Sequence, residues 1–189
     1  MHSEQQPGKA LGVVLVGLPA RSRTTLERFV ARGYDVLLVD IDEAADVEGN
    51  LTTVRHGMDA VQDRTTGGKI AVVGYGFGGR YAFLALTRLG ADAAAAFCGT
   101  GIGAHLDEAP AAKLPLSLHF GDDDERVPFA EVRTIKGALE GFATTEIYRY
   151  PGVGHGFAMR EHAGFDEPAA RAAERRVFDF LDALAGTEV

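Results

Sequence analysis

Short runs of apolar residues recur along the chain without alternating with polar ones, a pattern typical of strands that are buried on both faces of a sheet. The runs are four to six residues long and rich in valine, isoleucine, leucine and alanine. Each is predicted to be an interior strand. The six predicted strands are Leu11 to Val16, Val36 to Ile41, Ile70 to Val73, Ala93 to Cys98, Leu116 to Phe120 and Glu146 to Tyr150.

The stretches between these runs carry apolar residues at intervals of three and four, which predicts amphipathic helices. Strand and helix therefore alternate, which favours an α/β fold with a mainly parallel sheet of about six strands covered by helices on both faces. A functional crevice is expected at the carboxyl ends of the strands, with the irregular segment Gly99 to Lys113 as one wall. The predicted helices are Thr25 to Arg32, Leu51 to Asp63, Gly79 to Leu89, Ala130 to Leu139 and Ala169 to Leu184.

The bulk properties set the size and surroundings of this fold. A chain of 189 residues suits one domain, predicted over residues 11–186 after a polar tail over residues 1–10. No apolar run approaches the ~20 residues of a membrane span, so a soluble, cytoplasmic protein without a membrane partner is expected. The formal charge of −8 argues against a nucleic-acid partner. One cysteine and scattered histidines indicate neither a disulfide nor a metal site.

The most informative segment is KIAVVGYGFGGR, residues 69–80. It reads as a buried strand, a glycine-rich turn and the start of a helix, the layout of the G-x-S-x-G nucleophile elbow. Its central position is Gly76, which has neither hydroxyl nor thiol. Two interpretations are compatible. The missing side chain leaves space for a water or a substrate atom, or glycine relieves a turn that costs another residue ~1–3 kcal/mol.

An acid and a base follow the elbow in the order found in α/β-hydrolases. Asp124 lies in GDDDERVP and His155 in YPGVGHGF. With the elbow, these segments resemble the dienelactone hydrolase family, whose motifs read G-x-C-x-G-G, G-x-x-D-x-x-V-P and P-G-x-G-H-x-F. The resemblance covers Leu11 to Leu184. It implies a minimal α/β-hydrolase core without a cofactor, in which Asp124 and His155 form the catalytic dyad. The spacing to Val127 favours Asp124 over the neighbouring aspartates.

Other positions depart from that family. Leu18 falls where the family has a glutamate, and Pro19 falls where a backbone N–H completes the oxyanion hole, yet proline has no N–H. Phe77 N–H is then the remaining expected donor, and Tyr75 is expected to line the pocket. The family's substrate-binding arginine falls on Met159.

Cys98, at the end of a predicted strand, has two interpretations. It is a displaced nucleophile near the pocket, or a small buried apolar residue, since a thiol without an adjacent base keeps its proton.

Three functions follow from these residues. The first is an enzyme acting on a small acyl-, lactone- or carbonyl-bearing molecule, with the Asp124–His155 dyad as general base and no covalent nucleophile. Its reaction is water-directed hydrolysis, isomerisation, cyclisation or elimination. The second is a catalytically silent protein that binds a small molecule or a partner. The third is an esterase or lactonase using Cys98. The protein is expected to be a monomer or homodimer.

Overall fold

The computed structural model describes residues 9–20, 22–111 and 115–186. Most of the tail expected over residues 1–10 lies outside these ranges, and the first strand already begins at Lys9. Within the described ranges, no helix has both the length and the apolar character that crossing a bilayer demands.

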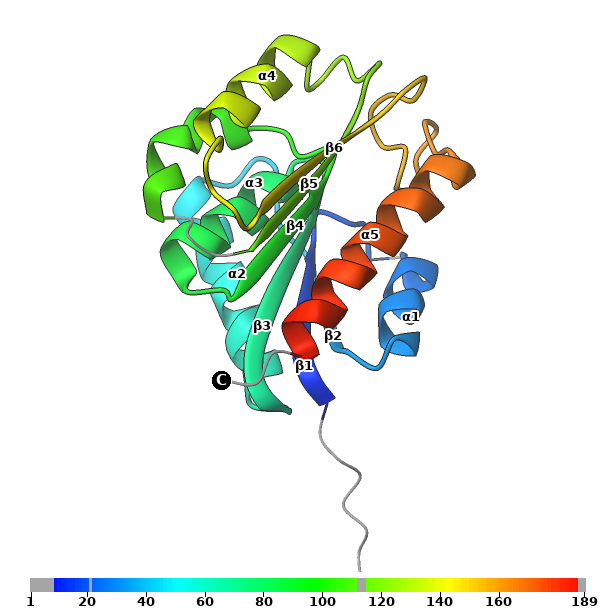
Figure 1. Cartoon of the computed structure of the whole chain (residues 1–189). Helices are drawn as coiled ribbons and strands as arrows, with labels where there is room; N and C mark the ends of the chain where they lie inside the picture. The colour runs from blue at the N-terminus through cyan, green and yellow to red at the C-terminus, as the bar shows by residue number, and fades with distance from the viewer. Residues whose placement is uncertain (1–8, 21, 112–114, 187–189) are drawn as a thin grey trace, which may run out of the picture.

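Six parallel strands form one sheet in the order β2-β1-β3-β4-β5-β6 (Figure 1). This arrangement confirms the predicted α/β class and strand number. The strands are β1 (Lys9–Val16), β2 (Asp35–Val39), β3 (Thr65–Tyr75), β4 (Ala93–Phe97), β5 (Leu116–Gly121) and β6 (Thr145–Tyr150).

Helices cover both faces of the sheet, with α1 and α5 on one side and α2, α3 and α4 on the other (Figure 1). Successive residues of a strand point to opposite faces, so β1 sends Leu15 toward α1 and α5 and Val16 toward the other layer. The helices are α1 (Arg23–Ala31), α2 (Val47–Gln62), α3 (Gly78–Leu84), α4 (Phe129–Ala138) and α5 (Glu167–Gly186).

Two segments differ from expectation. The single helix predicted to end at Leu89 is α3 followed by a π-helical turn, η1 (Ala85–Leu89). The segment predicted to be irregular contains the 3-10 helix η2 (Ile102–Ala111), kinked at His105 and packed on α3 and α4. Gly99 and Gly101 precede the helix, Gly103 lies in its first turn, and buried Ile102 anchors its start in the core. Residues 112–114, at the end of that prediction, lie outside the described ranges.

Four aromatic side chains form a continuous stack across the sheet on the face covered by α5. Tyr75, Phe97, His119 and Tyr148 are register partners on β3, β4, β5 and β6. Their ring centroids are 4.7, 5.1 and 5.2 Å apart. The guanidinium of Arg176, on α5, lies 4.1 Å from the Tyr148 ring centroid and caps the stack. The stack supports the register of these four strands. The candidate site lies at their carboxyl ends.

Candidate functional site

The predicted functional residues lie beyond the carboxyl ends of β3, β5 and β6. Parallel strands bring these ends to the same edge of the sheet, so residues far apart in sequence meet there. Gly76 follows β3, Asp124 follows β5 and His155 follows β6.

Gly76 forms the sharp turn between β3 and α3. Its φ of +52° lies in the left-handed region that favours glycine. Its N–H donates to Phe97 O at 3.0 Å, and its carbonyl accepts from Gly79 N at 3.0 Å and Thr100 N at 3.1 Å. The turn is thus tied to β4 and to the segment that follows it.

The end of β1 passes directly against this turn. A Cβ on Gly78 would overlap Val16 O, and a Cβ on Gly17 would lie 2.8 Å from Gly78 N. Neither position has room for a side chain. Close backbone packing therefore requires glycine at Gly78 and Gly17, whereas at Gly76 it is the turn that favours glycine.

His155 and Asp124 form a hydrogen-bonded pair. His155 Nδ1 lies 2.9 Å from Oδ2 and 3.2 Å from Oδ1 of Asp124. Oδ1 also accepts backbone N–H groups of Arg126, at 2.8 Å, and Val127, at 3.1 Å. Burial alone would raise the pKa of the Asp124 carboxyl, but the bonds from His155 and the two N–H groups outweigh it and hold that pKa below its usual value. The ionised carboxylate therefore accepts a hydrogen bond from Nδ1–H of His155, and in that tautomer Nε2 carries the free lone pair.

Backbone contacts hold the two loops of the pair together. Asp122 N donates to Tyr150 O at 2.9 Å, and Asp123 N donates to Val153 O at 3.0 Å. The Asp124 side chain is fully buried, whereas that of His155 is 12% exposed. The acid is thus enclosed and the base reaches the surface of the site.

The other nitrogen of His155 faces the elbow. A Cβ at position 76 would lie 3.5 Å from His155 Nε2 and 3.9 Å from Met159 Cε, both ordinary contact distances. A nucleophile's side chain would fit this space without a clash. Met159 occupies the position at which an arginine is expected from the family resemblance, and it makes this side of the site apolar.

The side chains of three other candidate residues do not join the Asp124–His155 pair. Tyr75 is fully buried in the aromatic stack, so its side chain belongs to the core and not to a pocket wall. Leu18 is buried and lines a cavity beside β2 and α1. Phe77 is the N-cap of α3, and its ring packs edge-on against Tyr81.

Cys98 lies closer to the pair than its position in the sequence indicates. Its sulfur, a carboxylate oxygen of Asp124 and a ring nitrogen of His155 are all within 4.8 Å of one another. Burial raises the pKa of the Cys98 thiol to about 12, and the side chain is only 1% exposed. Both features oppose the thiolate that a nucleophile requires.

His162 is a neighbour of the site that the sequence does not indicate. Its ring centroid is 5.9 Å from that of His155, with the planes at 78°. A turn in which His162 N donates a hydrogen bond to Met159 O places it beside His155. No motif marks this residue, because the turn and not the spacing brings it close.

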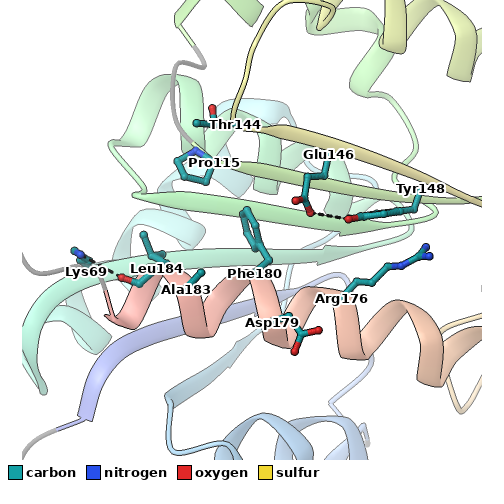
Figure 2. Close-up of a pocket in the computed structure, with 10 residues that line it drawn as sticks. All are labelled: Lys69, Pro115, Thr144, Glu146, Tyr148, Arg176, Asp179, Phe180, Ala183 and Leu184. Carbon is teal, nitrogen blue, oxygen red and sulfur yellow. Dashed lines mark hydrogen bonds between the residues drawn. The ribbon is translucent and has the colours of Figure 1, made fainter.

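A separate cavity of about 540 Å³ lies between α5 and β6 (Figure 2). Its wall combines Phe180 and Tyr148 with charged side chains, and Glu146 accepts the Tyr148 hydroxyl hydrogen bond at 2.9 Å. Neither Asp124 nor His155 contributes to its lining. The candidate site and this cavity are distinct features of the molecule.

Comparisons with known proteins give related sequences and related structures. The model of the dienelactone hydrolase family matches residues 42–185. A carboxymethylenebutenolidase of Pseudomonas putida is 30% identical over 139 residues, which is 74% of this chain and 56% of that enzyme. The chain thus spans about half the length of the curated relatives that it matches.

Solved structures share the fold at low sequence identity. A Pyrococcus furiosus esterase has a TM-score of 0.76 at 17% identity, covering 95% of this chain and 83% of that one. A dienelactone hydrolase-like promiscuous phosphotriesterase from metagenomic libraries has a TM-score of 0.73 at 20% identity, covering 96% and 89%.

Proposed function

Because the chain belongs to the dienelactone hydrolase family, we propose that it hydrolyses a small ester or lactone with the Asp124–His155 pair as general base and water as the nucleophile. The observation that carries this proposal is the position of His155. Its Nδ1 is bound by Asp124, while its Nε2 lies 3.5 Å from the place of the missing Cβ at Gly76.

A water in that space would donate a hydrogen bond to Nε2. As the water oxygen attacks the carbonyl carbon, its proton passes to Nε2, and the Asp124 carboxylate stabilises the imidazolium that forms. Collapse of the tetrahedral intermediate returns the proton to the leaving alkoxide. The balance is ester plus water to acid plus alcohol, and no bond to the protein forms.

The oxyanion would accept a hydrogen bond from Phe77 N–H, at the elbow where α3 begins. Pro19 has no N–H to serve as a second donor. One missing donor of this kind costs about 3–4 kcal/mol of transition-state stabilisation. We therefore expect slow turnover, best with activated esters or strained lactones.

The substrate is inferred to be uncharged near the reacting carbonyl. Met159 contacts the elbow space, and the chain carries a formal charge of −8, which disfavours anions. The curated relatives are carboxymethylenebutenolidases, a name that denotes a lactone. We therefore infer that the substrate is a small lactone without a carboxylate.

The test is the initial rate with p-nitrophenyl acetate and with dihydrocoumarin. His155→Ala should lower the rate by about 10²–10⁴-fold, the usual contribution of a general base. Asp124→Asn should also lower it, because a neutral amide no longer stabilises the imidazolium that forms on His155. His56→Ala, at an exposed position on α2, is the matched control and should not change the rate. Rates equal in wild type and His155→Ala would refute the proposal.

A binding protein is the second candidate function, favoured by the absence of a nucleophile at Gly76. It predicts that a ligand raises the melting temperature by mass action and is recovered unchanged. Any turnover that depends on His155 would exclude it.

A further inference from the structure

Three metal-binding atom types meet at three neighbouring strand ends. Cys98 follows β4, Asp124 follows β5 and His155 follows β6. The sulfur, a carboxylate oxygen and a ring nitrogen lie within 4.8 Å of one another. No motif reveals this group, because its members are separated by 26 and 31 residues along the chain.

Thiolate, carboxylate and imidazole are the ligands that zinc prefers, with bonds of about 2.3, 2.0–2.2 and 2.0–2.1 Å. Ligands at those lengths on a tetrahedral ion lie roughly 3.3–3.6 Å apart. His155 Nδ1 and Asp124 Oδ2 are already 2.9 Å apart. The sulfur lies within 4.8 Å of the other two atoms, so it must approach them by about 1.2 Å at most to reach a separation of roughly 3.6 Å. One thiolate and one carboxylate neutralise a divalent cation.

The surroundings of the sulfur suit an anion once a cation is present. Burial raises the pKa of the thiol, and the Asp124 charge adds to this effect, whereas backbone N–H groups of Gly156, Phe157 and Gly121 directed at the sulfur lower the pKa. The first two effects disfavour an isolated thiolate. A bound dication reverses both, because it supplies the missing positive charge.

The backbone also fixes the direction of the thiol. Cys98 has φ +51° and is the one non-glycine residue with positive φ in the described ranges. Its N–H donates to His119 O at 2.8 Å, which ties it to β5. The side chain is therefore held toward the end of β5, where Asp124 lies.

We propose that Cys98, Asp124 and His155 form a binding site for Zn²⁺ or a similar divalent transition metal, with water completing the coordination. The metal replaces the thiol proton, which passes to solvent, and forms bonds to sulfur, oxygen and nitrogen. No oxidation or reduction is involved.

This site has a consequence for the proposed general base. If the metal binds Nδ1, the proton of the neutral ring stands on Nε2, and if it binds Nε2, the metal uses that nitrogen's lone pair, so in both cases Nε2 has no lone pair for a substrate proton. In either case metal binding and proton abstraction exclude each other. This consequence rests on the proposed function, whereas the site itself does not.

The test is titration of the metal-free protein with Co²⁺, followed by absorption spectroscopy without substrate. Wild type should bind one equivalent, with visible bands of a tetrahedral ion and a near-ultraviolet sulfur-to-cobalt charge-transfer band, and Zn²⁺ should abolish both. Cys98→Ala should lose the charge-transfer band and bind at least tenfold more weakly. Asp124→Asn should weaken binding and keep the band.

His56→Ala is the control for binding by exposed histidines and should titrate as wild type. Thermal melting of each variant establishes that it is folded. Cys98→Ser provides a second variant of nearly the same volume, and it too should lose the sulfur band. Absence of the band in wild type, or equal Co²⁺ binding by wild type and Cys98→Ala, would overturn the site. Neither result depends on whether the protein hydrolyses esters.

Discussion

Replacing Gly76 by cysteine should install a nucleophile in the empty elbow. The new Cβ would lie 3.5 Å from His155 Nε2 and 3.9 Å from Met159 Cε, so it enters without a clash. Rotation about Cα–Cβ can then bring the sulfur to within about 3 Å of Nε2, the reach of a nucleophile and its base. Gly76→Cys should accordingly form an acyl-enzyme with p-nitrophenyl acetate.

The cost of this substitution is set by the backbone. At φ +52°, a residue with a Cβ loses about 1–2 kcal/mol relative to glycine. For a domain of this size, that loss corresponds to a melting temperature lower by about 2–8 °C. The variant should remain folded at room temperature.

The assay is intact-mass spectrometry after mixing with the ester, together with the burst of nitrophenol. Gly33→Cys is the matched control, since its φ is +91° and no atom lies within 4 Å of its Cβ. It carries similar backbone strain and an equally new thiol, but no nearby base. A folded Gly76→Cys variant that gains no acetyl group faster than Gly33→Cys would refute the proposed geometry of the site.

Three stability predictions test the packing around the site. His119 is fully buried and its pKa is lowered to about 3 by burial and by Arg176, so the folded state resists a proton that the unfolded chain takes up below pH 6.5. Stability should fall by about 1.4 kcal/mol per pH unit between pH 6.5 and about 3, and denaturant titrations should find a shallower fall for His119→Phe. The buried carboxylate of Glu174 lies 2.5 Å from the guanidinium of partly exposed Arg28. Glu174→Ala should therefore lower the free energy of unfolding, measured in urea, by about 1–3 kcal/mol. An unchanged free energy of unfolding would mean that the pair is solvated. Gly78→Ala should destabilise the fold because its Cβ would overlap Val16 O, while Gly137→Ala, on α4 with open space, should raise the melting temperature; equal shifts would contradict the packing at the elbow.

The sequence predicts the layers of this fold well because the signal is local. Each strand is a short apolar run, each helix has its own periodicity, and their alternation dictates a parallel sheet. The boundaries of α3 and η2 are less predictable. A π-helical turn keeps the apolar spacing of an α-helix. Glycine and proline within Ile102–Ala111 obscure a 3-10 helix that buries Ile102 and Ala109.

The sequence predicts only those site residues that stand in recognisable motifs. Gly76, Asp124 and His155 stand in recognisable contexts, so the sequence predicts their grouping. Tyr75 is adjacent to Gly76 in sequence, yet side chains alternate across a strand, and its ring points into the core under α5. The approach of Cys98 depends on how three strand ends are packed, which no spacing in the sequence encodes.

The most direct measurement is the mass of wild-type protein quenched during turnover of p-nitrophenyl acetate, with product measured in the same sample. If the Asp124–His155 pair directs water, product will accumulate above background while the protein keeps its unmodified mass, and His155→Ala will produce none above background. An acetyl adduct on Cys98, or product formation equal to that in buffer, would contradict the account.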